Sequence, residues 1–440
     1  MTISAKEFQR RRRQLARIMG SGAMAVIPAA PEKVRSRDTH YRYRQDSDFH
    51  YLTNFPEAEA VAVIMPGRPE GEFVLFCRPE DKTRTLWDGA NVGLKDAKKC
   101  FGADEAFSIN DIDHLLPELL SSCDCVYYSM GVYPEFDQRI LGWMAQTRSD
   151  RQKTRGSNKL EEIVALDFVL HDMRLYKSRS EIAQMRRAAN IAVKTHERAM
   201  RFCQPGVSER AIVAEIEQEF FRQGGEPAYL SIVAAGNNAC TLHYVDYHDT
   251  VNEGDLVLID AGCELDYYCS DVTRTFPANG CFTPEQRAIY ELVLKSQYAA
   301  IEEVREGNAY DAPHNAAVKV ITKGLLKLGL LKGTLAKNIH DESYKAFFPH
   351  KTGHWLGIDV HDVGDYKVDE EWRELEPSMV LTIEPGIYIA PGNKKIPKKW
   401  WGIGVRIEDD VLVTDDDPLV LSGKLIKEPD DIEAFMQQSH

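Results

Sequence analysis

Short apolar runs alternate with amphipathic helical patterns along the first third of the chain. Apolar runs at residues 23–28, 60–66, 72–78 and 125–130 have the length and composition of strands. Residues 111–122 have the spacing of an amphipathic helix. This alternation predicts an α/β domain over residues 1–150, and the polar, aperiodic segment that follows predicts a linker at 151–172.

The pattern changes in the rest of the chain. Residues 171–203 follow one amphipathic periodicity, which predicts a single long helix. A second helical pattern at 208–225 ends in two glycines, as helices often do. Beyond residue 228 short strands dominate, with helical segments at 283–304 and 316–329. The sequence therefore predicts an α+β domain over residues 173–440, with helices on a mostly antiparallel sheet.

Four consecutive arginines, Arg10 to Arg13, stand near the N-terminus. Ser4 and Glu7 before them have the spacing of a helix capping box, and no apolar signal-peptide core follows. The sequence predicts a solvated amphipathic helix here rather than a targeting signal.

Composition excludes several classes of protein. With 440 residues and 43% hydrophobic content the chain can build two cores, and a net charge of −14 argues against nucleic-acid binding. None of the nine cysteines forms a CxxC pair, which favours reduced thiols and a cytoplasmic location over disulfides or a thiolate zinc site. No window approaches 18 apolar residues, so no membrane association is expected.

Two stretches of the second domain resemble each other, DLVLIDAG at 255–262 and MVLTIEPG at 379–386. Each is an apolar strand that ends in an acid, Asp260 or Glu384, and each is followed by a strand with another acid, Asp271 or Glu408. The repeat predicts two related hairpins in a pseudo-symmetric sheet.

The first hairpin allows a geometric prediction. With its tip at Leu265 and Asp266, Asp260 and Asp271 lie directly opposite each other and point to one face. The structural alternative is that Asp260 caps a turn and Asp271 pairs with Arg274.

Four acids at matching strand ends would give a buried pocket a charge near −4. Two divalent cations neutralise such a pocket, and carboxylate and imidazole ligands suit Mn²⁺, Zn²⁺, Co²⁺ or Fe²⁺. A neutral nitrogen ligand is available from His350, His354 or His361, in a segment whose glycines favour loop and strand over helix.

The motifs DAGCELDYYCSDVTRTF, GHWLGIDVHD, LTIEPGIY and GVRIEDD occur in this order and resemble the "pita-bread" metallopeptidases. This family includes methionine aminopeptidase, prolidase, creatinase and aminopeptidase P. The N-terminal motifs YRYRQDSDFHYLTNF and AAPEKVRSRD are similar to the creatinase-type domain of aminopeptidase P, so the resemblance spans nearly the whole chain.

The resemblance implies a site and a cofactor. The five metal ligands would be Asp260, Asp271, His354, Glu384 and Glu408. They would hold two divalent ions, most often manganese in this family, with cobalt or zinc as substitutes, and Asp271 and Glu408 would bridge them.

The resemblance also implies roles around the metals. Glu384, His361 and His243 would be catalytic, with Glu384 moving the proton and His361 contacting the substrate carbonyl. The residues that would bind substrate are His243, His350, His361, Arg406, Tyr229 and Trp87. Asp38 would support Arg406, and Trp87 would reach a neighbouring subunit of a dimer or tetramer, although surface packing explains Trp87 equally well.

The implied activity is hydrolysis of the N-terminal Xaa-Pro peptide bond by a hydroxide that bridges the metals. The expected substrates of the protein are peptides with proline at the second position. The alternatives are a prolidase that cleaves Xaa-Pro dipeptides and a non-catalytic binding module of the same fold. Cys263 and Cys269 flank the expected site and are expected to be inert core thiols.

Overall fold

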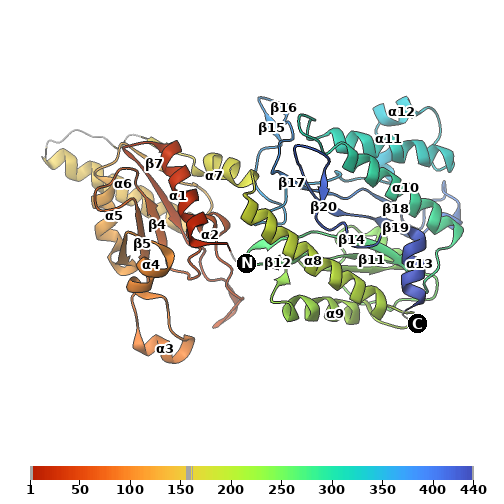
Figure 1. Ribbon diagram of the computed structural model, residues 1–440, viewed down its shortest axis with the longest axis horizontal. Helices are drawn as coiled ribbons and strands as arrows, with labels where there is room; N and C mark the ends of the chain where they lie inside the picture. The colour runs from red at the N-terminus through yellow and green to blue at the C-terminus, as the bar shows by residue number, and fades with distance from the viewer. Residues whose placement is uncertain (1–2, 155–159, 161, 439–440) are drawn as a thin grey trace. The chain divides into compact units, whose positions relative to one another are not determined.

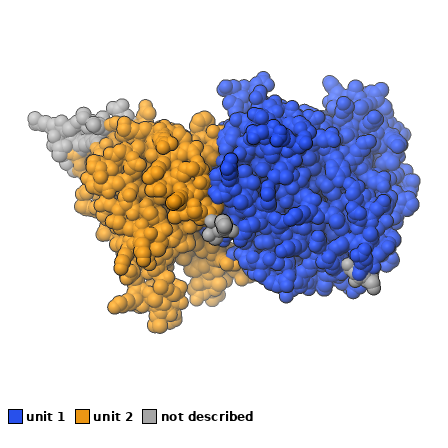
Figure 2. Space-filling view, viewed as in Figure 1, with its two compact units in different colours: residues 1–2, 174–440 blue, residues 3–173 orange. Residues whose placement is uncertain are grey.

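The structure is a computed structural model that describes residues 3–154, 160 and 162–438 (Figure 1). It divides into two compact units, residues 3–173 and residues 174–440 (Figure 2). The segment predicted as a linker contains the end of one helix, a short strand and the start of another helix among its described residues. Residues 155–159 and 161 of that segment lie outside the described residues.

The N-terminal unit is built on a six-stranded sheet in the order β6-β5-β4-β1-β7-β8. Its strands are β1 Ala23–Pro28, β4 Val61–Ile64, β5 Phe73–Cys77, β6 Glu105–Ser108, β7 Cys125–Tyr127 and β8 Glu162–Val164. The four strands predicted from apolar runs are present. β4 pairs antiparallel with β1 and β5, whereas β7 is parallel to β1 and β8, so the sheet is mixed.

Seven helices and a small hairpin are described around this sheet. The helices are α1 Ala5–Met19, α2 Ser47–Thr53, α3 Lys82–Asp88, α4 Gly93–Phe101, α5 Ile112–Leu120, α6 Pro134–Thr154 and α7 Leu166–Leu175, and the hairpin is β2 Val34–Ser36 with β3 Thr39–His40. Helix α5 agrees with the pattern at 111–122.

Only half of the arginine run of α1 is solvated as the sequence predicts, since Arg10 and Arg13 are exposed but their two neighbours are not. Arg11 and Arg12 are buried and donate to the carbonyls of Tyr51 and Leu52, at 3.0 and 2.8 Å. These carbonyls lie in the last turn of α2, where unpaired carbonyls and the helix dipole favour a cation. Two charges are therefore buried because α2 supplies acceptors for them. Ser4 is the N-cap of α1, but its side chain makes no capping hydrogen bond.

The single helix predicted over 171–203 is two helices, α7 and α8 Arg179–Phe202. Ser178 begins α8 with a complete capping box, in which its hydroxyl accepts from the Glu181 backbone and the Glu181 carboxylate accepts from the Ser178 backbone. An amphipathic periodicity continues across such a break, because it reports which residues are buried and not where the backbone turns.

The first three of the remaining helices described in the C-terminal unit agree with predicted helical patterns, and no sequence pattern predicted the last two. These remaining helices are α9 Glu209–Arg222, α10 Pro284–Glu302, α11 Ala312–Lys327, α12 Leu335–His340 and α13 Pro429–Gln437. Apolar side chains from α8, α9, α10 and α11 pack with strand residues such as Val257 and Leu381 in one continuous core. Within the residues that the structure describes, no helix is long and apolar enough to cross a membrane.

The strands of this unit form several small antiparallel sheets. The main strands are β9 Glu226–Pro227, β10 Ile232–Ala235, β11 Leu256–Asp260, β12 Cys263–Leu265, β13 Tyr268–Cys269, β14 Thr273–Pro277, β17 Val380–Ile383, β18 Gly386–Ile389, β19 Ile403–Arg406, β20 Asp409–Leu412 and β21 Leu419–Val420. The sheet β10-β11-β14 contains the first of the two similar sequence stretches, and the sheet β17-β20-β21 contains the second. A separate two-stranded sheet is formed by β15 Lys367–Val368 and β16 Glu371–Trp372. The mostly antiparallel arrangement confirms the predicted fold class.

Candidate metal centre

The second hairpin brings its two acids directly opposite each other. Ile383 pairs with Asp409 in β17–β20, and Gly386 pairs with Arg406 in β18–β19. This register is continuous, so Glu384 and Glu408, which lie between the two paired segments, face each other. Because opposed residues of an antiparallel pair share a face, both carboxylates point to one side.

The first hairpin has a different register from the predicted one. Asp260 pairs with Thr273, and the tip is formed by Asp266 and Tyr267, which both have positive φ. Such a pair of left-handed residues makes a tight two-residue turn that matches strand twist. The predicted tip at Leu265 and Asp266 is wrong by one residue, so Asp271 lies two residues away from the position opposite Asp260.

Asp260 and Asp271 nevertheless meet, because a tyrosine joins them. The hydroxyl of Tyr229 hydrogen-bonds to both carboxylates. The two strands of the hairpin approach each other closely at Gly262, where a Cβ atom would lie 1.9 Å from the carbonyl oxygen of Ser270. The alternative pairing of Asp271 with Arg274 is not formed, since Arg274 contacts Asp409 at 2.8 Å.

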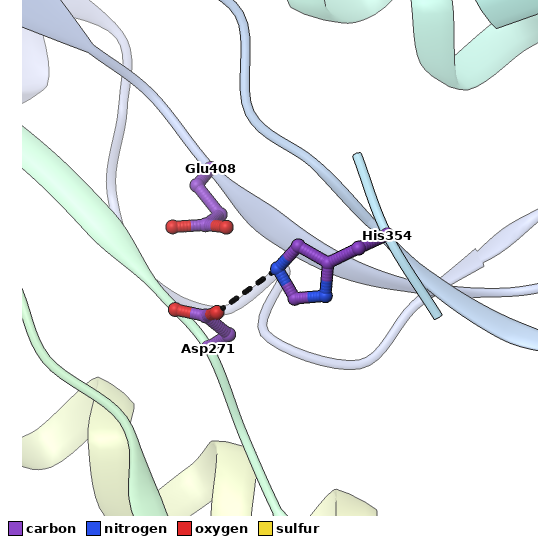
Figure 3. A group of neighbouring side chains, drawn as sticks. All are labelled: Asp271, His354 and Glu408. Atoms are coloured by element: carbon purple, nitrogen blue, oxygen red, sulfur yellow. Dashed lines mark ion pairs between the residues drawn. The ribbon is translucent and has the colours of Figure 1, made fainter. Parts of the chain in front are cut away.

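Asp271, His354 and Glu408 point toward one another from three separate segments (Figure 3). One donor atom from each lies within 4.8 Å of the others. His354 Nε2 is 3.3 Å from Asp271 Oδ2, and His354 Nδ1 is 2.9 Å from the carbonyl of Trp355. A carbonyl accepts only, so Nδ1 carries a hydrogen and Nε2 is the nitrogen that faces the carboxylates.

The other two predicted ligands adjoin this group. Glu384 Oε1 lies 3.6 Å from His354 Nε2, and Asp260 Oδ2 accepts from Arg406 Nη2 at 2.6 Å. Glu408 Oε2 accepts from the hydroxyl of Thr273 at 2.7 Å. All five residues predicted as ligands therefore lie in one connected set of side chains.

Burial and mutual repulsion make the charged form of this set costly. Desolvation, together with the neighbouring acids, raises the pKa of Glu384 to about 7 and raises the pKa values of Asp260 and Glu408. Desolvation also opposes ionisation of Asp271, but the hydrogen bond and charge of His354, the hydrogen bond from Tyr229 and the charge of Arg406 together outweigh it and lower the pKa of Asp271. Desolvation favours neutral His354, yet contact with Asp271 and Glu384 raises its pKa to about 9.

These donors fit divalent metal ions. Three buried carboxylates and the partly exposed carboxylate of Glu384 repel one another, and Arg406 and His354, whose pKa is raised, contact them as cations. Carboxylate oxygens and one imidazole are ligands that several first-row divalent ions accept. Arg406 and Thr273 hold carboxylates from outside, in the way that outer-shell hydrogen bonds orient metal ligands.

Three further histidines surround the carboxylates. The ring of His361 lies 4.3 Å from that of His354, centre to centre. His350 Nε2 is 2.9 Å from the Tyr388 hydroxyl, and burial lowers the pKa of His350 to about 3, which keeps it neutral. His243 is exposed, and as a cation it would lower the pKa values of both His350 and His361.

Two residues with predicted roles lie in the N-terminal unit. Trp87, on α3, is 81% exposed, and Asp38 lies between β2 and β3. Their roles toward a neighbouring subunit and toward Arg406 stay predictions, as does the role of Tyr229 in substrate binding.

Sequence reasoning missed Thr273 and Tyr388. Thr273 stands two residues after Asp271, and Tyr388 shares its hydroxyl between Arg406, at 3.0 Å, and His350. The sequence feature that could have indicated them is strand alternation, which places residues two apart on the same face of a strand. That signal identifies the face but not the hydrogen-bond partner.

Comparison with known proteins identifies the class of protein. The model of "Metallopeptidase family M24" matches residues 183–415, and that of "Aminopeptidase P, N-terminal domain" matches residues 8–127. The chain therefore belongs to metallopeptidase family M24.

Particular relatives are similar over their whole length. The chain is 43% identical to the Xaa-Pro aminopeptidase of Escherichia coli K12, covering 99% of this chain and 98% of that protein. It is 34% identical to human Xaa-Pro aminopeptidase 3, covering 99% and 87%.

Solved structures of aminopeptidases are also similar to this chain over its whole length. Pseudomonas aeruginosa aminopeptidase PepP has a TM-score of 0.98 at 52% identity, covering 100% of this chain and 99% of that one. Zn-substituted Escherichia coli aminopeptidase P in complex with product has a TM-score of 0.96 at 42% identity, covering 100% of both chains. These similarities confirm the predicted family and both parts of the predicted fold.

Proposed function

We propose that this protein is an Xaa-Pro aminopeptidase, a hydrolase that releases the first residue of peptides whose second residue is proline. The observation that carries this proposal is the convergence of four carboxylates and His354 in a chain similar over its full length to enzymes of that name. The bond cleaved precedes proline, a tertiary amide without an N–H.

Asp260, Asp271, His354, Glu384 and Glu408 would hold two divalent ions, with Asp271 and Glu408 shared between them. Manganese is our first choice, and cobalt or zinc could replace it, since oxygen and nitrogen ligands accept all three. When bound, such ions lower the pKa of water and polarise a carbonyl.

The surrounding residues would carry out the other parts of the reaction. Glu384, whose pKa is raised to about 7, suits a group that takes up a proton and passes it to the leaving nitrogen. His361 would donate a hydrogen bond to the oxyanion that develops on the substrate carbonyl. His350, which is neutral, and His243 would orient the peptide beside it.

The test is the substitution Glu384→Gln, which keeps the size of the side chain and removes its ability to move a proton. We expect loss of turnover of Xaa-Pro-Yaa peptides by roughly 1,000-fold or more, since both proton transfer and metal chemistry depend on this side chain. Circular dichroism should be unchanged. Glu371→Gln, at an exposed position in β16, is the matched control and should keep full activity. Retained activity in Glu384→Gln would contradict the assignment.

Peptide length distinguishes this activity from its alternatives. An Xaa-Pro aminopeptidase cleaves Xaa-Pro-Yaa better than the dipeptide Xaa-Pro, whereas a prolidase prefers the dipeptide. A non-catalytic binding module would cleave neither and would contain no divalent ion after loading, which elemental analysis would reveal.

The proposal includes an assembly and a location. Exposed Trp87 supports a homo-oligomer, a dimer or tetramer, in which Trp87 reaches the site of a neighbouring subunit. The nine free cysteines support a cytoplasmic location, where thiols stay reduced.

A further inference from the structure

A cluster of four charges, three of them buried, lies beside the candidate metal centre, and none of its members belongs to the predicted site. Arg174 Nη2 contacts Asp359 Oδ2 at 2.7 Å and Asp362 Oδ1 at 2.6 Å. Lys177 Nζ contacts Asp362 Oδ2 at 3.0 Å. The side chains of Arg174, Lys177 and Asp362 are at most 3% exposed. Two buried cations thus hold one buried carboxylate.

This cluster holds one end of the segment 354–362, which we call the histidine loop. The Asp362 backbone donates to the Trp355 carbonyl at 2.9 Å and closes the loop on itself. Gly357 lies so close that a Cβ atom there would be 2.0 Å from Asp362 Oδ2 and 2.9 Å from the Lys177 side chain. The loop is therefore packed around the carboxylate that the cluster neutralises.

The two histidines of the loop are held in different ways. His354 is tied to β17, since its carbonyl accepts from Thr382 at 2.9 Å and its backbone N–H donates to the Thr382 hydroxyl at 3.1 Å. His361 is the chain neighbour of Asp362. The orientation of the His361 ring against His354 therefore depends on where Asp362 is held.

We propose that Lys177 and Arg174 are positioning residues that act through Asp362 to set the His361 imidazole against the substrate. This inference rests on the proposed function. Breaking a buried ion pair leaves an uncompensated charge, so the loop end that carries Asp362 would shift while the His354 end stays on β17. Misplacing a substrate-contacting group by about 1 Å can lower a rate roughly 100-fold.

The test compares Lys177→Met with Lys177→Arg in the full-length protein loaded with Mn²⁺. We expect Lys177→Met to lower kcat for an Xaa-Pro-Yaa peptide by about 10- to 100-fold, with metal content unchanged and KM altered less than about 3-fold. Lys177→Arg keeps the charge and should restore most of kcat. Arg198→Met breaks ion pairs to Glu215 and to buried Glu219 between α8 and α9, and as a control it should leave kcat unchanged.

A double-mutant cycle with His361→Ala separates positioning from general damage. If Lys177 acts through His361, adding Lys177→Met to His361→Ala should lower kcat less than about 2-fold further. If the two losses multiply, or if Lys177→Arg is as inactive as Lys177→Met, the inference is wrong.

Crystal structures of the wild type and the two Lys177 variants test the inference without any assay of activity. The His361 ring should move relative to His354 in Lys177→Met and stay in place in Lys177→Arg, and an unmoved ring would overturn the inference. A wild-type protein that cleaves no Xaa-Pro peptide would instead overturn the proposed function, so the two failures are distinguishable.

Discussion

Tyr229 is the residue whose side chain contacts both acids of the first hairpin. Its hydroxyl hydrogen-bonds to both Asp260 and Asp271. The strand register by itself does not bring these acids together, because Asp271 lies two residues away from the position opposite Asp260. A sequence pattern cannot reveal this contact, because Tyr229 stands in a different segment and approaches only in the folded chain.

Replacing Tyr229 with Phe should therefore weaken metal binding. Loss of a hydrogen bond that orients metal ligands typically lowers affinity about 10- to 100-fold. Calorimetric titration of the metal-free protein with Mn²⁺ measures this. Tyr128→Phe is the control, because it removes a similar hydrogen bond, to Asp137 in the N-terminal unit. Equal affinities of Tyr229→Phe and wild type would show that the bridge does not organise the site.

The raised pKa values of Glu384 and His354 predict how pH affects the metal-free protein. Both are raised above their unfolded values, Glu384 to about 7 and His354 to about 9. The raised pKa of Glu384 contributes folding stability that is fully present below about pH 4.5 and is lost as the pH rises through 7. The raised pKa of His354 contributes folding stability that is fully present below about pH 6.5 and is lost as the pH rises through 9.

The stabilisation that a metal confers should therefore increase with pH, since metal binds the deprotonated ligands. We expect the rise in Tm on adding Mn²⁺ to the chelated protein to be larger at about pH 8.5 than at about pH 6. Thermal unfolding of both forms across this range measures it. A rise in Tm that shrinks with increasing pH would contradict the titration of these ligands.

At the scale of elements, the two strands of the first hairpin approach each other closely at Gly262, between Asp260 and Asp271 in the chain. Gly262 permits this approach because the Ser270 carbonyl and the Tyr229 ring occupy the space of a side chain. Gly353 has the same property against β17, where a Cβ atom would lie 1.9 Å from the Thr382 carbonyl.

Gly262→Ala should push the two strands of the hairpin apart. Overpacking against backbone costs roughly 1–3 kcal/mol, and here it should also separate the two acids and lower activity at least about 10-fold. Urea unfolding and turnover measure the two effects. Gly142→Ala in α6 meets open space and, as a control, should change stability by less than about 1 kcal/mol, in the stabilising direction.

At the scale of the whole molecule, Trp87 is an aromatic side chain that is 81% exposed. If a neighbouring subunit uses it, Trp87→Ala should raise KM with little change in Tm. Mixed oligomers of Trp87→Ala with Glu384→Gln subunits should then regain part of the activity that each variant lacks. Activity assays measure KM and the regained activity, and light scattering measures whether the subunits form oligomers. An unchanged KM would assign Trp87 to surface packing.

The sequence by itself determined the element types and the chemistry of this protein. Alternation and helical periodicity located the strands and helices, because these patterns record which face of an element is buried. Acids at the ends of apolar strands predicted a candidate metal site, because a buried carboxylate requires a compensating charge.

Only the tertiary structure decided which residues meet. The register of the first hairpin, the bridge by Tyr229 and the cluster around Asp362 depend on turn geometry and on segments far apart in the chain. The break at Ser178 and the burial of Arg11 and Arg12 depend on capping partners that periodicity does not record. Local patterns report burial, whereas the pairing of polar groups is settled by what the fold places beside them.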